Sequence, residues 1–183
     1  MRLSYTVGMT AGQMFLAKAR YFLGTEYRTQ IRLSVEALTD EALWWRANDQ
    51  SNSVGNLLLH LNGNVRQWIL AGVGRQQDDR HRAAEFAARS GPAASALLAT
   101  LDRTLDDVDR VLAGLSDNDL LSERTIQGRD VSVLDAIFHV VEHFSQHLGQ
   151  ITLIAKLRAP GAINFYEDAG GLATPLWMAH IRR

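Results

Sequence analysis

Apolar residues recur every three or four positions through most of this 183-residue chain, which is the spacing of an amphipathic helix. This spacing predicts four long helices, each preceded by a capping residue or begun by a proline. Their predicted bounds are Thr10–Ala37, Val54–Ala71, Pro92–Gly114 and Ser132–Leu157. Strand-like alternation is almost absent. The pattern therefore predicts an all-α protein built as a bundle of four helices.

The segments between these helices are short and polar, or rich in turn-forming residues. A capped turn at Thr39 follows the first helix, and the stretch GVGRQQDDRHR reads as a polar connection after the second. The stretch ERTIQGRDVS has an extended, turning pattern, and the tail after Pro160 is weakly patterned. We therefore expect a single domain over residues 1–183, with a core over about 11–157 and a short tail over 158–183.

The charge balance argues against two classes of partner. The chain carries 19 basic and 20 acidic residues, for a net charge of -1. This balance provides no field that would attract nucleic acid or a membrane surface, so neither partner is expected. No apolar run is long enough to span a bilayer, and no secretory signal is recognisable at the N-terminus. We therefore expect a cytoplasmic protein.

The chain contains no cysteine, which limits its possible chemistry. Disulfides, thiolate metal ligands and a cysteine nucleophile are excluded. A bound metal ion must then be held by histidine, aspartate, glutamate or backbone oxygen. Any thiol chemistry would require an external low-molecular-weight thiol.

Three of the six histidines, His139, His143 and His147, occupy every fourth position of the last predicted helix. Because each four-residue step turns a helix by only about 40°, their imidazoles form a slanted stripe. From the centre of the apolar face, His147 lies about 80° away, His143 about 120° and His139 about 160°. We therefore expect His143 and His147 to share a metal ion, with His139 pointing most nearly to solvent.

A third ligand is expected from a facing helix, and His60 is the best candidate. It lies among leucines in the second predicted helix, a very apolar setting for an imidazole. The alternative reading of His60 is a hydrogen-bonded core residue with no ligand role. Three neutral imidazoles would suit Zn²⁺, Ni²⁺ or Fe²⁺ and would leave at least one position open for water or substrate.

Two blocks of the sequence resemble a known family. SVGNLLLHLNGNVRQWI in the second helix and SVLDAIFHVVEHFSQHLGQITLIAKL in the fourth resemble the DinB-like (DinB/YfiT) superfamily. The match is to a small uncharacterised branch with the pattern HVVEHFxxHxGQI. The segment LTDEALWWRANDQSNSVGNLLLHL resembles the same branch. The similarity extends from about Ala11 to Leu157.

The resemblance implies a fold, a site and a chemistry. It implies an up-down-down-up four-helix bundle with one long crossover, often assembled as a homodimer. It implies a metal site formed by His60, His143 and His147, and helix geometry independently favours the pair His143 and His147. Some superfamily members are thiol-dependent S-transferases or isomerases, whereas others have no assigned activity. A small-molecule substrate is therefore possible.

Three hypotheses about function remain open. The first is a metal-dependent transferase or hydrolase with a three-histidine site. The second is a non-catalytic protein whose ion ties two helices together, and the third is a dimerisation module. An open coordination position beside a pocket would favour the first hypothesis, and a closed four-ligand site the second.

Several other side chains have two readings. For His139 the readings are a surface or dimer-interface residue and a role beside the ligands or substrate. Gln146 and Gln150 are either boundary residues or partners that orient an imidazole. The remaining expectations are a solvated Glu142, close helix packing at Gly149, core or pocket-wall roles for Trp44, Trp45 and Trp68, possible anion binding by Arg46 and Arg66, and surface positions for His81 and His180.

Overall fold

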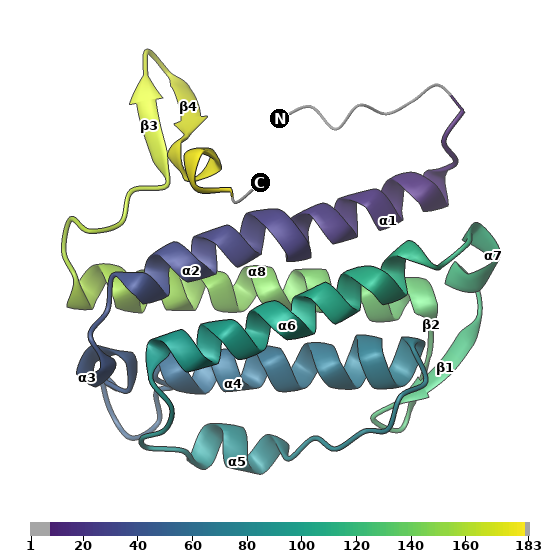
Figure 1. The fold of residues 1–183 in the computed structure, drawn as a ribbon, viewed down its shortest axis with the longest axis horizontal. Helices are drawn as coiled ribbons and strands as arrows, with labels where there is room; N and C mark the ends of the chain where they lie inside the picture. The colour runs from purple at the N-terminus through teal and green to yellow at the C-terminus, as the bar shows by residue number, and fades with distance from the viewer. Residues whose placement is uncertain (1–7, 182–183) are drawn as a thin grey trace.

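The computed structural model describes residues 8–181, and they form a mostly helical protein (Figure 1). The first long helix begins at a capping box in which Thr10 and Gln13 bond each other's backbone. It runs as α1 (Ala11–Tyr21), a π-helical turn η1 (Phe22–Tyr27) and α2 (Arg28–Glu36). The prediction of one long helix here is confirmed, although its middle is wound more widely than an α-helix.

Of the three further long helices, the third and fourth along the chain each pack against both the first and the second. The caps of these three helices include capping boxes at Ser53 and Ser132. The predicted start at Pro92 is wrong by two residues, because Ala93 is the cap. The helices are α4 (Val54–Val65) with its π-helical continuation η2 (Arg66–Val73), α6 (Ala94–Ala113) and α8 (Val133–Arg158).

Short helices occupy the connections. α3 (Asp40–Leu43) is capped by the Thr39 side chain, as the sequence predicts. α5 (Arg82–Ala87) lies along the outside of α4 (Figure 1) and was not expected from the polar connection. α7 (Asp117–Leu120) and the 3₁₀ turn η3 (Leu176–His180) complete the helical elements of residues 8–181.

Two small antiparallel sheets correct the all-α prediction. The first pairs β1 (Glu123–Ile126) with β2 (Arg129–Ser132), and its turn places Gln127 and Gly128 at positive φ. This hairpin corresponds to the segment read as extended and turning. The second pairs β3 (Tyr166–Ala169) with β4 (Leu172–Pro175) in the tail, where the sequence showed little pattern.

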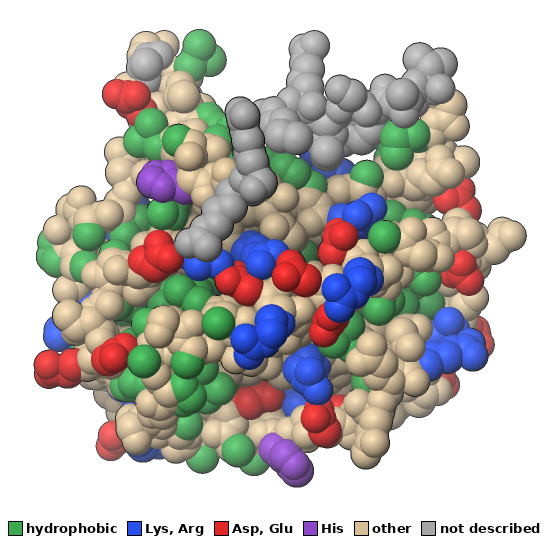
Figure 2. Space-filling model, in the orientation of Figure 1, with side chains coloured by type: hydrophobic (Ala, Val, Ile, Leu, Met, Phe, Trp, Pro, Cys, Tyr) green, Lys and Arg blue, Asp and Glu red, His purple; other side chains and the backbone are tan. Residues whose placement is uncertain are grey.

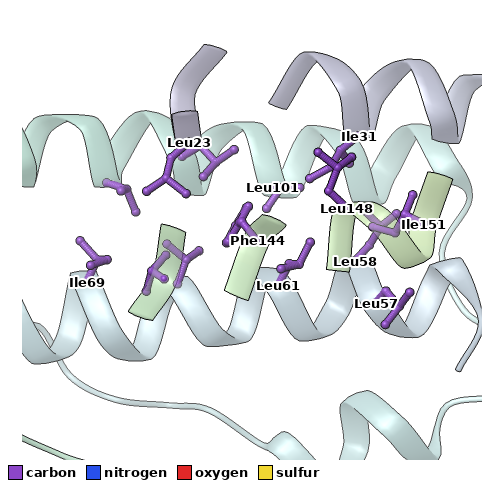
Figure 3. Packing of buried hydrophobic residues seen from close by; sticks show 14 of the residues in the cluster. Leu23, Ile31, Leu57, Leu58, Leu61, Ile69, Leu101, Phe144, Leu148 and Ile151 are labelled. Atoms are coloured by element: carbon purple, nitrogen blue, oxygen red, sulfur yellow. The ribbon is translucent and has the colours of Figure 1, made fainter. Parts of the chain in front are cut away.

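The hydrophobic core lies between the long helices. Figure 3 shows Leu23 and Ile31 from the first helix directed toward Leu58, Leu61 and other side chains of the same cluster. The buried face of α8 carries Val140, Phe144 and Ile151 through the middle of this core, each 0% exposed. Burying one such side chain contributes roughly 2–3 kcal/mol, so this face determines how α8 is rotated.

The outer face of the first helix is joined to α6 by ion pairs. Arg20 binds Asp109, and Arg28 binds Asp102 and Asp106. Figure 2 shows acidic and basic side chains interspersed over this face. Partly exposed pairs of this kind contribute at most about 1 kcal/mol each. Within residues 8–181, no helix is both long and apolar enough to cross a membrane.

Candidate metal site

Three histidines from two helices meet at the seam between α4 and α8. His60 projects from α4, and His143 and His147 project from successive turns of α8. One potential ligand atom from each lies within 4.8 Å of the others. The Nε2 atoms of His60 and His143 are 2.9 Å apart. The structure thus brings together the three residues that the sequence analysis selected.

Local structure explains why the rings converge. Four-residue spacing brings His143 and His147 together on one side of α8, with ring centroids 4.4 Å apart and the rings nearly perpendicular. The His60 ring lies 4.9 Å from the His143 ring and 5.0 Å from the His147 ring. His60 is only 4% exposed, whereas the other two are half-buried. The cluster is therefore anchored in the core on the α4 side and opens toward the surface along α8.

A carboxylate determines which nitrogen of His60 faces the cluster. Glu85 Oε2, from α5, lies 2.8 Å from His60 Nδ1. An ionised carboxylate only accepts hydrogen bonds, so Nδ1 carries the proton and donates a hydrogen bond to Glu85. The lone pair of His60 is then on Nε2, the atom directed at His143. This is the arrangement by which carboxylates commonly orient histidine ligands of metals.

Arg80 holds the Glu85 carboxylate in place. Its Nε donates to Oε1 at 2.8 Å and its Nη2 donates to Oε2 at 2.9 Å. The side chains of Arg80 and Glu85 are only 3% and 10% exposed, so each charge is desolvated and depends on the other. Burial works to raise the pKa of Glu85, but the hydrogen bonds from Arg80 and His60 outweigh it and hold that pKa below its ordinary value.

Side chains of Asn56 on α4 and of Arg46 before it hold the segment that carries Glu85 through hydrogen bonds to its backbone. The Asn56 amide donates to the carbonyl oxygens of Glu85 and Ala88. Arg46 donates to the carbonyl oxygens of Phe86 and Ala88 and to Asn56 Oδ1. Arg46 therefore has a structural role, and the prediction that it binds an anionic substrate receives no support from these contacts.

Close approach of α5 to α4 requires a residue without a side chain at Gly63. A Cβ added there would lie 2.1 Å from Glu85 Oε1 and 3.1 Å from Arg80 Nε. The carboxylate occupies the space that any larger residue would need. Gly149 on α8 is different, because a Cβ there would meet nothing within 4 Å, so the predicted close packing at Gly149 is wrong.

His147 also has an outer hydrogen bond that orients it. Its Nδ1 lies 3.0 Å from Gln150 Oε1, so Nδ1 donates and Nε2 carries the lone pair. Of the two readings of Gln150, the structure supports the one in which it orients an imidazole. Gln146 bonds Glu142 instead, and both are exposed, as expected for solvated residues.

Burial favours the neutral form of the imidazoles on α8. Desolvation, with added repulsion from His147, His60 and His139, lowers the pKa of His143 from 6.5 to about 3. Desolvation also lowers the pKa of His147, against a raising effect of its bond to Gln150. Neutral imidazole is the form that coordinates a metal ion.

The donor set fits a divalent ion of the Zn²⁺, Ni²⁺ or Fe²⁺ type. Two imidazoles on one tetrahedral ion at about 2.1 Å would have nitrogens about 3.4 Å apart. Here the Nε2 atoms of His60 and His143 are 2.9 Å apart, and all three ligand atoms lie within 4.8 Å of one another. Outer hydrogen bonds from His60 and His147 leave their Nε2 atoms free for coordination. Among residues 8–181, the group contains three ligating side chains and no fourth. Catalytic zinc sites commonly have three protein ligands and an open position.

His139 does not point to solvent, contrary to the prediction. Its ring lies 4.1 Å from the Trp68 ring and 5.4 Å from the His143 ring, and it is half-buried. Its Nε2 lies 3.5 Å from the Asn64 amide nitrogen. The indole of Trp68 belongs to η2 and covers the side of α8 that the helical wheel assigned to solvent. His139 therefore lies one turn of α8 before His143, next to the three clustered histidines.

The remaining predicted residues lie away from the cluster or form its surroundings. Arg66 pairs with Asp79, and His81 and His180 are exposed. Trp68 is buried, and Trp44 packs against the core. Arg80 and Glu85, the most important supports of His60, were missed because they lie in and just after a stretch that reads as a polar connection. Their only sequence signal is an arginine five residues before a glutamate.

Comparison with known proteins places the chain in a class. A crystal structure of a DinB-like protein from Bacillus cereus ATCC 10987 matches with a TM-score of 0.59 and 19% sequence identity. The match covers 74% of this chain and 91% of that chain. At this identity the likeness concerns the fold, which is that of a DinB-like helical protein.

The family is shown by the sequence itself. Residues 10–162 match the family described as "Protein of unknown function (DUF1572)", which is DinB-like, and the chain belongs to this family. The match includes all three clustered histidines as well as Arg80 and Glu85. No curated protein matches the chain.

Proposed function

We propose that His60, His143 and His147 hold one divalent metal ion, Zn²⁺, Ni²⁺ or Fe²⁺, and that the protein is a metal-dependent enzyme. The proposed reaction is S-transfer to or from an external low-molecular-weight thiol, or hydrolysis. The observation that carries the proposal is a cluster of three imidazoles whose free nitrogens converge, with no fourth ligating side chain among residues 8–181. This donor set favours an open site over a closed structural one.

The ion would serve as a Lewis acid that lowers the pKa of a thiol or a water molecule reaching its open position. The chain's own residues would supply orientation. Glu85 and Arg80 hold the His60 ring, and Gln150 holds the His147 ring. The lack of cysteine means that any thiol must come from solution.

The wider arrangement is part of the same proposal. We propose an up-down-down-up four-helix bundle in which the connection between η2 and α6 is the long crossover. This connection includes α5, which supports His60 from outside the bundle. We also propose that the protein works in the cytoplasm as a homodimer.

Metal analysis of the purified protein tests the site. We expect about one ion per chain, and replacement of His143 and His147 by alanine should abolish binding. His81→Ala, which removes an exposed histidine, is the matched control and should keep its metal. An unchanged metal content in the double variant would contradict the proposed site.

A thermal-shift screen tests the chemistry separately. Low-molecular-weight thiols should raise the melting temperature of the metal-loaded protein, because a ligand that binds only the folded state stabilises it. The thiols should have no such effect on the variant lacking His143 and His147. Stabilisation of wild type and variant alike would show that thiols bind elsewhere.

A further inference from the structure

A cavity of about 380 Å³ lies beside the histidine cluster on the seam between α4 and α8. Leu57 contributes from α4, Gln150, Leu153, Ile154 and Leu157 contribute from α8, and Trp45 contributes from the segment after α3. A volume of this size is within the range of small-molecule sites. The other lining residues, Ala47, Gln50, Ser51 and Asn52, belong to the loop before α4, so the cavity has an apolar side along α8 and a more polar side along this loop.

Along both helices, residues that line the cavity come within one turn of the clustered histidines. Leu57 and His60 are three residues apart on α4, and His147 and Gln150 are three residues apart on α8. Three residues advance a helix by about 4.5 Å, so the wall of the cavity begins less than one turn from the ligands. On α8, Gln150 and Ile154 lie seven and eleven residues after His143, which returns them to the same side of the helix.

Gln150 belongs to both places. Its amide oxygen accepts the hydrogen bond from His147 Nδ1, and its side chain lines the cavity. A molecule in the cavity would therefore touch a residue that orients a ligand. This contact places the cavity next to one of the three ligands, on the outer side of the His147 ring.

The apolar walls of the cavity are exposed on α8. Leu153 is 61% exposed and Leu157 is 60% exposed. Trp45 forms another wall, with the guanidinium of Arg158 4.9 Å from its ring centroid. Large apolar side chains gathered at a concave surface are typical of a binding site rather than of ordinary solvent-exposed surface.

We infer that this cavity holds the apolar body of the substrate, an aliphatic or aromatic group, while the reacting atom attached to it reaches the metal held by His60, His143 and His147. The inference rests on the proposed function, because it requires a metal with an open position. It narrows the substrate class to molecules that combine a metal-reaching head group with an apolar tail.

A chain-length series of thiols tests this inference. The protein is loaded with Co²⁺, whose absorption reports a bound thiolate, and titrated with ethanethiol, propanethiol, butanethiol and pentanethiol. The head group is constant, so only burial of the tail varies. Affinity should rise by about fourfold for each added methylene, the value expected for a methylene removed from water.

Variants of the cavity wall show where the tail lies. Leu153→Ser combined with Leu157→Ser should flatten the dependence on chain length and leave ethanethiol affinity unchanged. Both positions are exposed, so the fold should tolerate the change. Phe138→Ser is the matched control, since Phe138 is 57% exposed on the same helix but lies outside the cavity. The control should keep the full dependence.

The outcomes separate this inference from the function on which it rests. If the protein binds no metal, the proposed function is wrong. If it binds Co²⁺ and ethanethiol but affinity does not rise with chain length, only the cavity assignment is wrong. A third outcome is that wild type is a dimer whose thiol affinity does not depend on chain length, while the double variant is a monomer. It would show that a second copy of the chain covers these leucines. That result would also overturn the inference.

Discussion

Glu85 Oε2 lies 2.8 Å from His60 Nδ1, so a carboxylate from outside the long helices decides which nitrogen of His60 faces the histidine cluster. Arg80 donates two hydrogen bonds to the same carboxylate. The result is a chain of contacts from Arg80 through Glu85 to His60, each link almost completely buried. Its expected effect is on metal affinity, because it holds one ligand in the correct tautomer and direction.

Replacing Glu85 by glutamine should weaken metal binding about 10- to 100-fold. Glutamine has nearly the same shape but lacks the charge that pairs with Arg80 and favours the proton on His60 Nδ1. Competition with a chromophoric chelator would measure the change. Glu142→Gln removes an exposed carboxylate next to His143 and is the control. Equal affinity of the Glu85 variant and wild type would show that Glu85 only supports folding.

Replacing Gly63 by alanine should displace the Glu85 carboxylate without altering any charged or ligating residue. The added Cβ would lie 2.1 Å from Glu85 Oε1, too close for any real contact. We expect lower metal affinity and a loss of roughly 1–3 kcal/mol in stability from overpacking. Chemical denaturation and metal titration would measure both effects.

Gly149→Ala is the matched control for this prediction. The same change is made within a long helix, but nothing lies within 4 Å of the added Cβ. Alanine has the higher helix propensity, so this variant should gain up to about 1 kcal/mol and bind metal normally. Similar behaviour of the two glycine variants would contradict the role assigned to Gly63.

Without metal, the stability of the protein should fall as the pH drops below about 6.5. Burial lowers the pKa of His143 from 6.5 to about 3 and also lowers the pKa values of His139 and His147. Between pH 6.5 and 3 these histidines therefore bind protons in the unfolded chain but not in the folded chain, which favours unfolding. The effect is absent above pH 6.5 and reaches at most about 1.4 kcal/mol per pH unit for His143.

Denaturant unfolding in the presence of a chelator, at pH 7.5, 6.5, 5.5 and 5.0, would measure this slope. His143→Gln should make it shallower, since one titrating group is removed. His81→Gln should leave it unchanged, because His81 is exposed. A slope that is the same in wild type and in His143→Gln would show that His143 does not titrate differently on folding.

The sequence by itself determined the local features of this protein. Helix periodicity and caps depend on neighbouring residues, so the four long helices and the caps at Thr10, Ser53 and Ser132 could be predicted. The proximity of His143 to His147 is equally local, because a four-residue step along one helix places their rings together. His60 could be proposed because its apolar setting and a family pattern both indicated it.

Tertiary structure alone decided what surrounds these histidines. A helical wheel measures directions from the apolar face of one helix and says nothing about what a neighbouring helix covers. For this reason it placed His139 in solvent, whereas Trp68 lies against it. Glu85 reaches His60 across 25 residues of chain, through an unexpected α5 and a space that exists only because Gly63 has no side chain. Such contacts depend on packing between distant segments, which no local pattern encodes.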